Sequence, residues 1–593
     1  MINDKNRKWW TLGTVCFALF MILLDGNVVN LAIPKIIQSF SANLSQVEWI
    51  NNAYLLTFAI LLITLGRLGD NFGLKKMFLI GLTMFTLGSI LCGAAPSVSW
   101  LIVFRIIQAI GGAAMMPATL SLISANFAKE ERGMAMGIWG AVSGLAIVFG
   151  PIIGGYLTDS GLGTNLNNLL QVKDFWRYVF YINIPVCIIG FIFALAVIKE
   201  SKDREKKHAF DILGVILSAS ALFLLTFGLI EGSKYGWFWA KEDFILGSFK
   251  IGIGNISAIP IFFILSVILL AWFVWHELRV KKDPLMDLVL FKSRNFAVGN
   301  FSGSILSFAM MGSFFLLPLF LQTILGYSAI KTGQVLVPLA LAIMFTAPVA
   351  GKISDKFGAK YIVMLGMIIM ALGSFYIAHF RLDTSVKSLI LPFVVMGLGM
   401  GLSLSPLTNI TLYDAPGDEV GGASGVFSTT RQIGSVMGIA ILGAVLQTTM
   451  ITNISSYIDN LSSLSPQSKE IVKEVINGKD FSFSDQKSQE LLANKLKDQM
   501  MAEAKEAAAQ SAPELTPREL SNPQLMAEIA KKQQEAQLAM VEKMKQAGQD
   551  VATAGKQGFV DSVNYTFRIA AVIALFGALS TLLFRNNSKI KAK

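Results

Sequence analysis

The chain has 593 residues, of which 53% are hydrophobic and only 15% are charged. Soluble globular proteins carry about 25% charged residues, so this composition excludes an ordinary soluble enzyme and indicates a protein of the lipid bilayer. The net charge of +11 does not indicate a nucleic-acid-binding protein, because the basic residues gather in short segments between apolar stretches, as they do at the rim of a membrane protein.

Apolar stretches of membrane-spanning length follow one another along the chain. A spanning helix needs roughly 20 apolar residues, and we place fourteen such stretches. They begin near Trp9, Val47, Leu74, Ser97, Met134, Phe175, Ala209, Ile256, Phe296, Thr332, Tyr361, Leu389, Gly421 and Val563. The sequence therefore predicts an all-α polytopic membrane protein with fourteen transmembrane helices.

The basic residues indicate the orientation of these spans. Lysine and arginine are concentrated in every second connection, for example at Lys75 and Lys76, in residues 202–207, and at Lys281 and Lys282. Cytoplasmic loops carry such an excess. We therefore expect a multi-pass protein of the cell (cytoplasmic) membrane, in contact with membrane lipids, with its N- and C-termini in the cytoplasm.

Two ten-residue segments repeat each other. Residues 66–75 read GRLGDNFGLK and residues 351–360 read GKISDKFGAK, so five positions match at identical spacing. Each segment joins the second and third helices of an apolar block, which predicts two six-helix bundles, at 1–198 and 294–593. Residues 199–293 then hold two additional helices and their linkers. Transporters with such parallel repeats hold their substrate near the membrane midplane, between the halves.

Residues 449–561 form a polar insertion between the last two predicted spans, and hence outside the cell in the expected orientation. Leucines and methionines recur there at helical spacing, with interruptions at Pro513, Pro517 and Pro523. We expect a largely helical extracytoplasmic segment over the outer mouth, which offers a surface for an extracytoplasmic partner. The alternative is a partly disordered charged loop.

Two charged residues fall inside predicted spans of the N-terminal half. Asp25 lies roughly 24 Å along the first span, and Arg105 lies roughly 12 Å into the fourth span from the opposite rim, so their heights are similar. Charges within a bilayer are costly and usually functional. We expect proton coupling, in which Arg105 lowers the proton affinity of Asp25 in one conformation and releases it in another. The structural alternatives are capping or packing for Asp25 and backbone binding for Arg105.

The fifth span and the repeated loop segments are the candidate gating elements. Ala146, Gly150 and Gly154 form a stripe of small residues that lets another helix approach closely, and Pro151 removes a backbone hydrogen bond and can bend the helix. Ordinary membrane-helix packing is the alternative. The set of expected gating residues is Gly66, Asp70, Gly73, Lys75, Gly150, Pro151, Gly154 and Asp355.

Within the first loop segment, a tight turn is expected at the cytoplasmic surface. Asp70 is expected to face the N-terminal, positive end of the helix that begins near Gly421, and so to join the halves on the inside. Anchoring of the loop to anionic lipid by Lys75 and Lys76 is the alternative.

The substrate cavity is expected to be apolar and adaptable. Methionine and phenylalanine on the ninth span offer polarisable and aromatic surface, although lipid contact explains them equally well. Arg431 is also intramembrane, with Asn409 as a candidate partner and a structural role as the alternative. The residues assigned to the cavity are Asn30, Gln108, Met310, Met311, Phe314, Phe315 and Arg431.

Six segments in order carry a family resemblance. They are LLDGNVVNLAIP at 23–34, the loop at 66–76, RIIQAIG at 105–111, the glycine-rich run at 144–155, WRYVFYINIP at 176–185 and RQIG at 431–434. Together they resemble the fourteen-span drug:proton antiporter branch of the major facilitator superfamily, although Ala109 stands where that family usually has glycine. The resemblance implies alternating access and coupling to protons instead of sodium.

The expected function is export of amphipathic small molecules, such as drugs, biocides and monovalent organic cations, in exchange for protons. Isolated histidines and cysteines argue against an enzyme, a metal or a cofactor. Residues 346–353 lack the first glycine and the final hydroxyl of an ATP-binding loop, so ATP is not an expected partner. The alternatives are an exporter or flippase of lipid-linked envelope components assisted by the insertion, and a non-transporting sensor.

Overall fold

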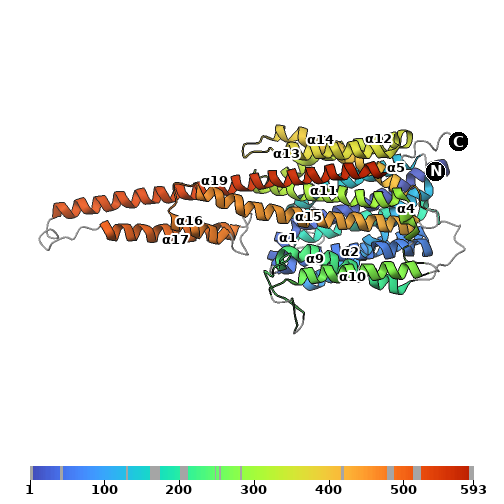
Figure 1. Ribbon diagram of the computed structural model, residues 1–593, viewed down its shortest axis with the longest axis horizontal. Coiled ribbons are helices and arrows are strands. Elements are labelled where there is room, and N and C mark those ends of the chain that lie inside the picture. Colours follow the sequence, from blue (N-terminus) through green and yellow to red (C-terminus); the bar gives the residue numbers. More distant parts are fainter. Residues whose placement is uncertain are drawn as a thin grey trace.

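The computed structural model is an all-helical bundle with a long helical projection (Figure 1). Helices form because the spans are apolar and a bilayer requires every backbone polar group to be satisfied within the segment. The structure describes residues 4–40, 44–128, 131–160, 174–200, 211–246, 249–252, 255–280, 284–286, 288–415, 420–476, 486–511 and 523–585.

The N-terminal half contains six spans. They are α1 (Asp4–Phe40), α2 (Leu44–Phe72), α3 (Leu74–Gly93), α4 (Val98–Asn126), α5 (Arg132–Ser160) and a broken sixth span made of η1 (Phe175–Arg177), α7 (Tyr178–Tyr181) and α8 (Asn183–Val197). The break after Tyr181 has a local cause. Pro185 has no backbone N–H to donate to the carbonyl of Tyr181, four residues earlier.

Two additional helices, α9 (Ile212–Tyr235) and α10 (Ala258–Arg279), follow as predicted. A short antiparallel hairpin joins them, with β1 (Phe244–Leu246) paired to β2 (Phe249–Ile251). The spacing of the sequence did not predict these strands. Aromatic and aliphatic residues of α9 and α10 pack against Leu56 of α2, so the pair flanks the N-terminal half. The turn η2 (Leu288–Lys292) leads to the second half.

The C-terminal half repeats the six-helix pattern. Its helices are α11 (Arg294–Thr323), α12 (Ala329–Phe357), α13 (Ala359–Ile377), α14 (Val386–Leu412), α15 (Val420–Asp459) and α19 (Pro523–Ser580), followed by η3 (Thr581–Leu583). Thirteen described helices are long and apolar enough to cross a membrane. Helix α5 occupies the place of the remaining predicted span, so the architecture agrees with a fourteen-helix bundle.

The sequence repeat corresponds to a structural repeat. Gly73 separates α2 from α3 and Gly358 separates α12 from α13, and both have positive φ values, 100° and 88°, which glycine adopts without steric cost. Lys75 Nζ donates to the carbonyl of Leu195 at 2.9 Å, and Lys360 Nζ donates to that of Leu582 at 2.7 Å. In each half, the lysine therefore ties the third helix to the end of the sixth.

The expected tight turn is much shorter than predicted. Helix α2 continues to Phe72 and α3 begins at Leu74, so only Gly73 departs from helix. Asp70 and Asp355 lie in α2 and α12, but their side chains are outside the described part of the structure. The expected contact between Asp70 and the helix beginning near Gly421 therefore stays a prediction.

The two halves meet along α5 and α12 and, on the other side, along α2, α4 and α15. The terminal end of the bundle is the end at which α1 begins and α19 finishes (Figure 1). Near it, Ser405 Oγ donates to the carbonyl of Gly133 at 2.8 Å, and the hydroxyls of Ser121 and Ser424 lie 2.9 Å apart. Direct polar contacts thus hold the halves together at the terminal end.

The insertion differs from the expected separate helices over the outer mouth. Helix α15 runs unbroken for 40 residues and α19 for 58 residues, which corresponds to lengths of about 60 and 87 Å. Both exceed the roughly 30 Å hydrocarbon core of a bilayer, so their polar parts project away from the bundle. Residues 449 and 561, the predicted boundaries, fall inside continuous helices. In α19, the stretch before residue 561 is rich in alanine, glutamate, lysine and glutamine, which let a helix propagate.

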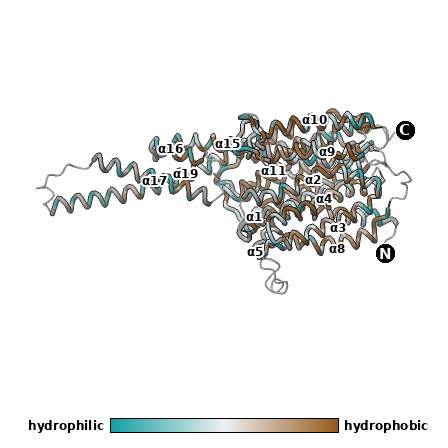
Figure 2. Tube along the Cα trace, turned by 90° about the horizontal axis from the view of Figure 1, so that it is seen from below, coloured by the Kyte–Doolittle hydropathy of each residue, from teal (hydrophilic) through white to brown (hydrophobic). Residues whose placement is uncertain are grey.

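Two shorter helices, α16 (Pro466–Ile476) and α17 (Gln486–Ser511), pack beside this projection. Figure 2 shows that the projection is mostly hydrophilic while the bundle is hydrophobic. An internal apolar cluster, which includes Ile454, Val472, Leu492 and Val551, holds the described helices of the projection together.

Tight packing between the halves at Gly351 gives a stability prediction. A Cβ atom on Gly351 would lie 1.9 Å from the carbonyl oxygen of Gly133, whereas one on Gly13 would meet nothing within 4 Å. Overpacking costs about 1–3 kcal/mol. We expect Gly351→Ala to lower the melting temperature of the detergent-purified protein, with Gly13→Ala as the matched control. Equal melting temperatures for the two variants would contradict the close contact.

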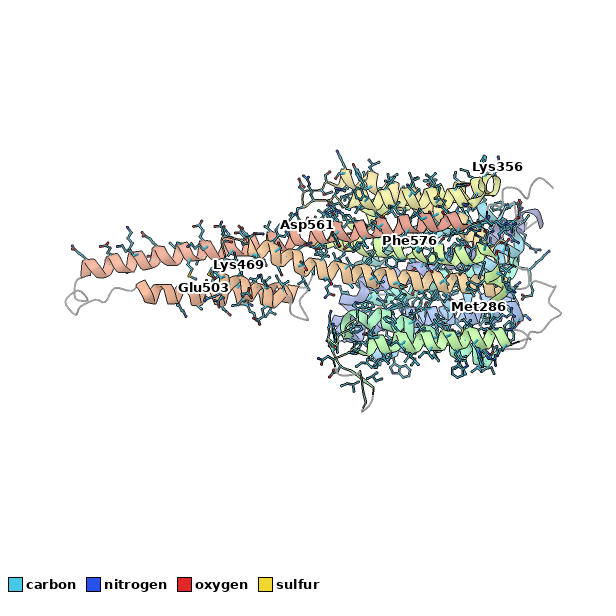
Figure 3. All side chains as sticks on the ribbon, in the orientation of Figure 1. Met286, Lys356, Lys469, Glu503, Asp561 and Phe576 are labelled. Carbon is cyan, nitrogen blue, oxygen red and sulfur yellow. The ribbon has the colours of Figure 1, made fainter. Side chains whose placement is uncertain are left out.

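Glu503 gives a pH prediction for the projection (Figure 3). Partial burial alone raises its pKa, but hydrogen bonds from Ser465, Ser468 and Gln499 to Oε1, at 2.5, 2.9 and 3.0 Å, outweigh this and hold the pKa below the ordinary value of 4.5. Because the folded pKa is the lower one, the stabilisation exists above pH 4.5 and is lost as the pH falls through the folded pKa.

The measurement is the distance between spin labels at Lys469 and Lys497, on α16 and α17. We expect the distribution to broaden on acidification from about pH 6 to about pH 3, and Glu503→Gln to weaken this dependence. Glu470→Gln, at a largely exposed position, should leave the dependence unchanged. An identical response in all three proteins would show that Glu503 does not contribute.

Candidate functional site

The structure brings the two intramembrane charges of the N-terminal half together. Asp25 on α1 and Arg105 on α4 form an ion pair with 2.5 Å between Oδ2 and Nη1, and their side chains are 0% and 1% exposed. The residues are 80 positions apart in the chain. The pair is therefore fully enclosed within the bundle of the N-terminal half.

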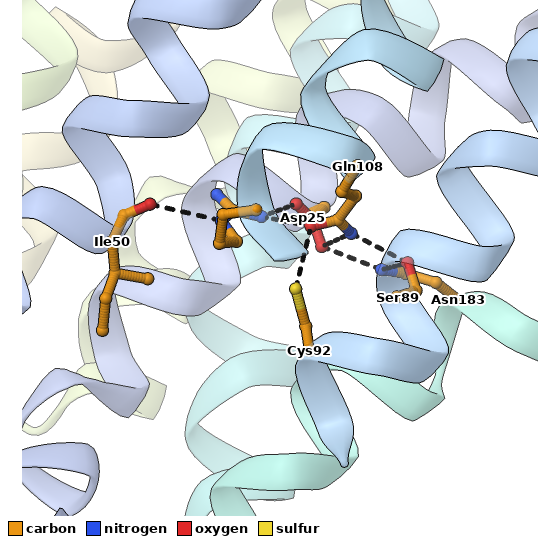
Figure 4. Close-up of polar contacts among 7 residues, drawn as sticks. Asp25, Ile50, Ser89, Cys92, Gln108 and Asn183 are labelled. Atoms are coloured by element: carbon orange, nitrogen blue, oxygen red, sulfur yellow. Dashed lines mark hydrogen bonds and ion pairs between the residues drawn. The ribbon is translucent and has the colours of Figure 1, made fainter. Parts of the chain in front are cut away.

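Neutral donors complete the surroundings of the carboxylate (Figure 4). Gln108 Nε2 donates to Asp25 Oδ1 at 2.9 Å, and Asn183 Nδ2 donates to the same oxygen at 2.8 Å. Both amides also donate to the hydroxyl of Ser89 on α3. With Arg105 on the other oxygen, Asp25 accepts three hydrogen bonds, which stabilise its charged form.

Arg105 has further contacts that do not depend on Asp25. Its Nη1 donates to Gln108 Oε1 at 2.7 Å, and its Nε donates to the backbone carbonyl of Ile50 at 3.4 Å. The guanidinium also lies 4.0 Å from the ring centroid of Tyr54, where a cation–π interaction is favourable. Arg105 can therefore remain in place when the charge of Asp25 is neutralised.

Local sequence explains how these side chains converge. A Cβ atom on Gly88 would lie 2.6 Å from Cα of Gln108, so glycine is needed for α3 and α4 to approach closely enough for Ser89 to reach Gln108. Asn183 is the first residue of α8, directly after the break that Pro185 introduces. The break directs its amide toward Asp25.

The arrangement is suited to switching a proton. An unpaired buried charge is strongly disfavoured, so the charged states of Asp25 and Arg105 depend on each other. Three donors surround the carboxylate of Asp25 in this conformation. Protonation of Asp25 requires that some of these donors turn away, and Arg105 has alternative acceptors in Gln108 and Ile50.

The other predicted site residues lie elsewhere. Gly73 forms the break between α2 and α3, and Lys75 on α3 donates to Leu195, as described above. Gly66 is buried near the end of α2. Gly150 and Gly154 are buried on α5, which packs against α12; the side chain of Pro151 is outside the described part. None of these residues contacts the ion pair through a hydrogen bond that involves the described side chains.

The residues assigned to the substrate cavity do not gather in one place. Gln108 is fully buried in the ion-pair cluster, and the side chain of Asn30 on α1 lies outside the described residues. Met310 is buried in the core of the C-terminal half, with Met311 and Phe314 packed partly against it, whereas Phe315 is 40% exposed.

Arg431 contacts residues other than the suggested Asn409. Its Nε donates to Ser307 Oγ at 3.3 Å, and its guanidinium lies 5.7 Å from the ring of Trp139 and 5.6 Å from that of Phe427. Trp139 belongs to α5 and Ser307 to α11, so Arg431 lies where the two halves meet.

Sequence reasoning assigned no role to Ser89, Asn183 or Tyr54. Asn183 carried a usable signal, because an amide in a strongly apolar span must find a hydrogen-bond partner. Glu231 was also missed; it is a buried acid on α9 that accepts a hydrogen bond from Asn52 of α2 at 3.3 Å. The hydrogen-bond partners of Asn183 and Glu231 lie on other helices, and the sequence alone does not show which helices pack together.

Comparison with known proteins identifies the family. The family model of the Major Facilitator Superfamily matches residues 15–439. The chain is 31% identical over 442 residues to the tetracenomycin C resistance and export protein of Streptomyces glaucescens, covering 74% of this chain and 76% of that protein. It is 33% identical over 468 residues to the multidrug transporter protein MdtP of Bacillus subtilis, covering 77% and 80%.

A solved structure supports the fold. A bacterial homologue of the human lysosomal transporter Spinster, in an inward-facing and unoccupied conformation, aligns with a TM-score of 0.51 at 16% identity and covers 98% of both chains. Together, the match over residues 15–439 and the extent of the identity to these transporters show that this chain belongs to the Major Facilitator Superfamily of membrane transporters.

Proposed function

We propose that this protein is a proton-coupled antiporter of the cell membrane that exports amphipathic small molecules by alternating access. The observation that carries the proposal is the buried cluster of Asp25, Arg105, Gln108 and Asn183. It combines one ionisable acid with a cation that has alternative partners. The relatives that export tetracenomycin C or act as multidrug transporters support export as the direction.

The proton step follows from the contacts. A proton that reaches Asp25 from outside neutralises the carboxylate and weakens its bond to Arg105. The guanidinium is then retained by the carbonyl oxygens of Gln108 and Ile50 and by the ring of Tyr54. When the cluster opens toward the cytoplasm, renewed pairing with Arg105 expels the proton, so that the ionised pair completes the cycle.

Helix α2 offers a route from this cluster to the rocking of the halves. It carries both Ile50 and Tyr54, which contact Arg105, and it packs against α15 of the other half. Close to the terminal end, a Cβ atom on Gly425 of α15 would lie 3.0 Å from the carbonyl of Leu62. A displacement of Arg105 would therefore alter contacts of α2, which is part of the interface between the halves.

The terminal end is assigned to the cytoplasm. Lys356 lies at this end (Figure 3), and Lys360 contacts Leu582 where α19 finishes. These positions accord with the excess of basic residues in cytoplasmic loops. The contacts of Ser405 with Gly133 and of Ser121 with Ser424 then close the cytoplasmic side. The described part of the insertion projects from the bundle and packs its apolar cluster internally. This arrangement favours export of small amphipathic molecules over the alternative of lipid export assisted by the insertion.

Removal of the carboxylate tests the coupling. In proteoliposomes with an imposed pH gradient, we expect Asp25→Asn to reduce gradient-driven transport of 8-anilinonaphthalene-1-sulfonate to the level of protein-free liposomes, because no group in the cluster can then carry the proton. Asp174→Asn, which removes the partly exposed partner of Arg177, is the matched control and should transport normally. Gradient-driven transport by Asp25→Asn would refute the coupling role.

Removal of one neutral donor tests the positioning of the carboxylate. A hydrogen bond to a charged group contributes about 1.5–3 kcal/mol. Asn183→Ala removes one of the three donors to the carboxylate of Asp25, and we expect the pH profile of gradient-driven transport to be displaced. Asn300→Ala, at an equally buried amide of the C-terminal half, should leave the profile in place. A lowered rate without a shift would indicate a purely structural role.

A further inference from the structure

A second intramembrane arginine lies outside the proton cluster. Arg431 is eleven residues from the first residue of α15, which places it roughly 16 Å along the helix, close to the middle of a hydrocarbon core of about 30 Å. Its side chain is partly buried. A guanidinium at this depth requires an anionic, carbonyl or aqueous partner.

The described contacts of Arg431 include no carboxylate. The hydroxyl of Ser307 accepts from Nε, and the rings of Trp139 and Phe427 are the other contacts. The two terminal amino groups of the guanidinium form no hydrogen bond with any residue in the described part of the structure. Arg105, by contrast, uses Nη1 for both Asp25 and Gln108. The two arginines therefore differ in whether the protein compensates their charge.

The surroundings of Arg431 are suited to an acidic molecule. A guanidinium binds carboxylate, sulfonate or phosphate groups through two parallel hydrogen bonds, and the two terminal amino groups are the donors for such a pair. Trp139 is 1% exposed and Phe427 is 0% exposed, so both rings are covered by packing in this conformation. The guanidinium is therefore the group that an anion can reach.

The position agrees with a substrate site. Trp139 comes from the N-terminal half, whereas Ser307, Phe427 and Arg431 come from the C-terminal half, and transporters of this architecture hold substrate between the halves near the midplane. A cationic substrate would be repelled by Arg431 and would find Asp25 already paired with Arg105.

We propose that Arg431 is the charge-selecting residue of the substrate site, and that the exported molecules are amphiphiles with a carboxylate, sulfonate or comparable anionic group. This inference rests on the proposed function and replaces the monovalent organic cations expected from the sequence. Binding of the anionic group supplies the counter-charge that the protein itself does not provide in its described residues.

Three probes that share one aromatic body test the charge preference. They are 1-pyrenebutyrate, the neutral 1-pyrenebutanol and a pyrenebutyl-trimethylammonium salt, and their binding to the full-length purified protein in detergent is followed by fluorescence. We expect the wild type to bind the carboxylate most tightly. Arg431→Gln should weaken carboxylate binding by about tenfold or more and leave the alcohol within about threefold. Arg431→Lys should retain part of the preference, because it keeps the charge but not the paired donors.

Arg279→Gln is the matched control, because Arg279 also lies over a tryptophan ring, that of Trp275, at 4.0 Å, but at the rim of α10. It should leave the binding of all three probes unchanged. Equal affinity of the wild type for the three charges, no binding of any probe, or equal weakening of all probes by Arg431→Gln would overturn the inference. Charge-selective binding without gradient-driven transport would instead uphold this site and refute the proposed proton coupling.

Discussion

The buried ion pair between Asp25 and Arg105 is the interaction on which the N-terminal half depends. Two charges without exposed surface are tolerated only when each has a partner and the remaining hydrogen-bonding positions are filled. Gln108 and Asn183 meet this requirement for the carboxylate, and Gln108, Ile50 and Tyr54 meet it for the guanidinium. Because five elements contribute (α1, α2, α3, α4 and α8), a change in the charge of Asp25 alters contacts across the whole half.

The structural repeat between the two halves explains how a change in the charge of Asp25 can move one half relative to the other. Each half has a one-residue glycine break between its second and third helices, and each has a lysine that ties the third helix to the end of the sixth. The halves are therefore internally tied units, and they touch through small residues such as Gly133, Gly351 and Gly425. Internally tied units that pack against each other along whole helices favour rocking over internal deformation.

Much of this could be predicted from the sequence, and the limits have physical causes. The spans were predictable from apolar length, and the two halves from the repeat at 66–75 and 351–360. Asp25 and Arg105 were found because a charge in a bilayer stands out against apolar neighbours. Asn183, Ser89 and Tyr54 were missed because a neutral polar or aromatic side chain gains a role only through its partner, which belongs to a distant helix. The continuity of α15 and α19 through the predicted ends of the insertion was not predicted, because helices continue where polarity changes.

The two intramembrane arginines, Arg105 and Arg431, differ in the groups that contact their guanidinium. In the N-terminal half, Asp25 and Arg105 compensate each other's charge without a substrate. At the junction of the halves, Arg431 has only a hydroxyl and aromatic rings as described partners. A transporter that compensated this charge internally would gain stability but lose selectivity for an anion, because the guanidinium would already be occupied. An uncompensated cation at the midplane instead makes its own stability depend on the molecule that binds there.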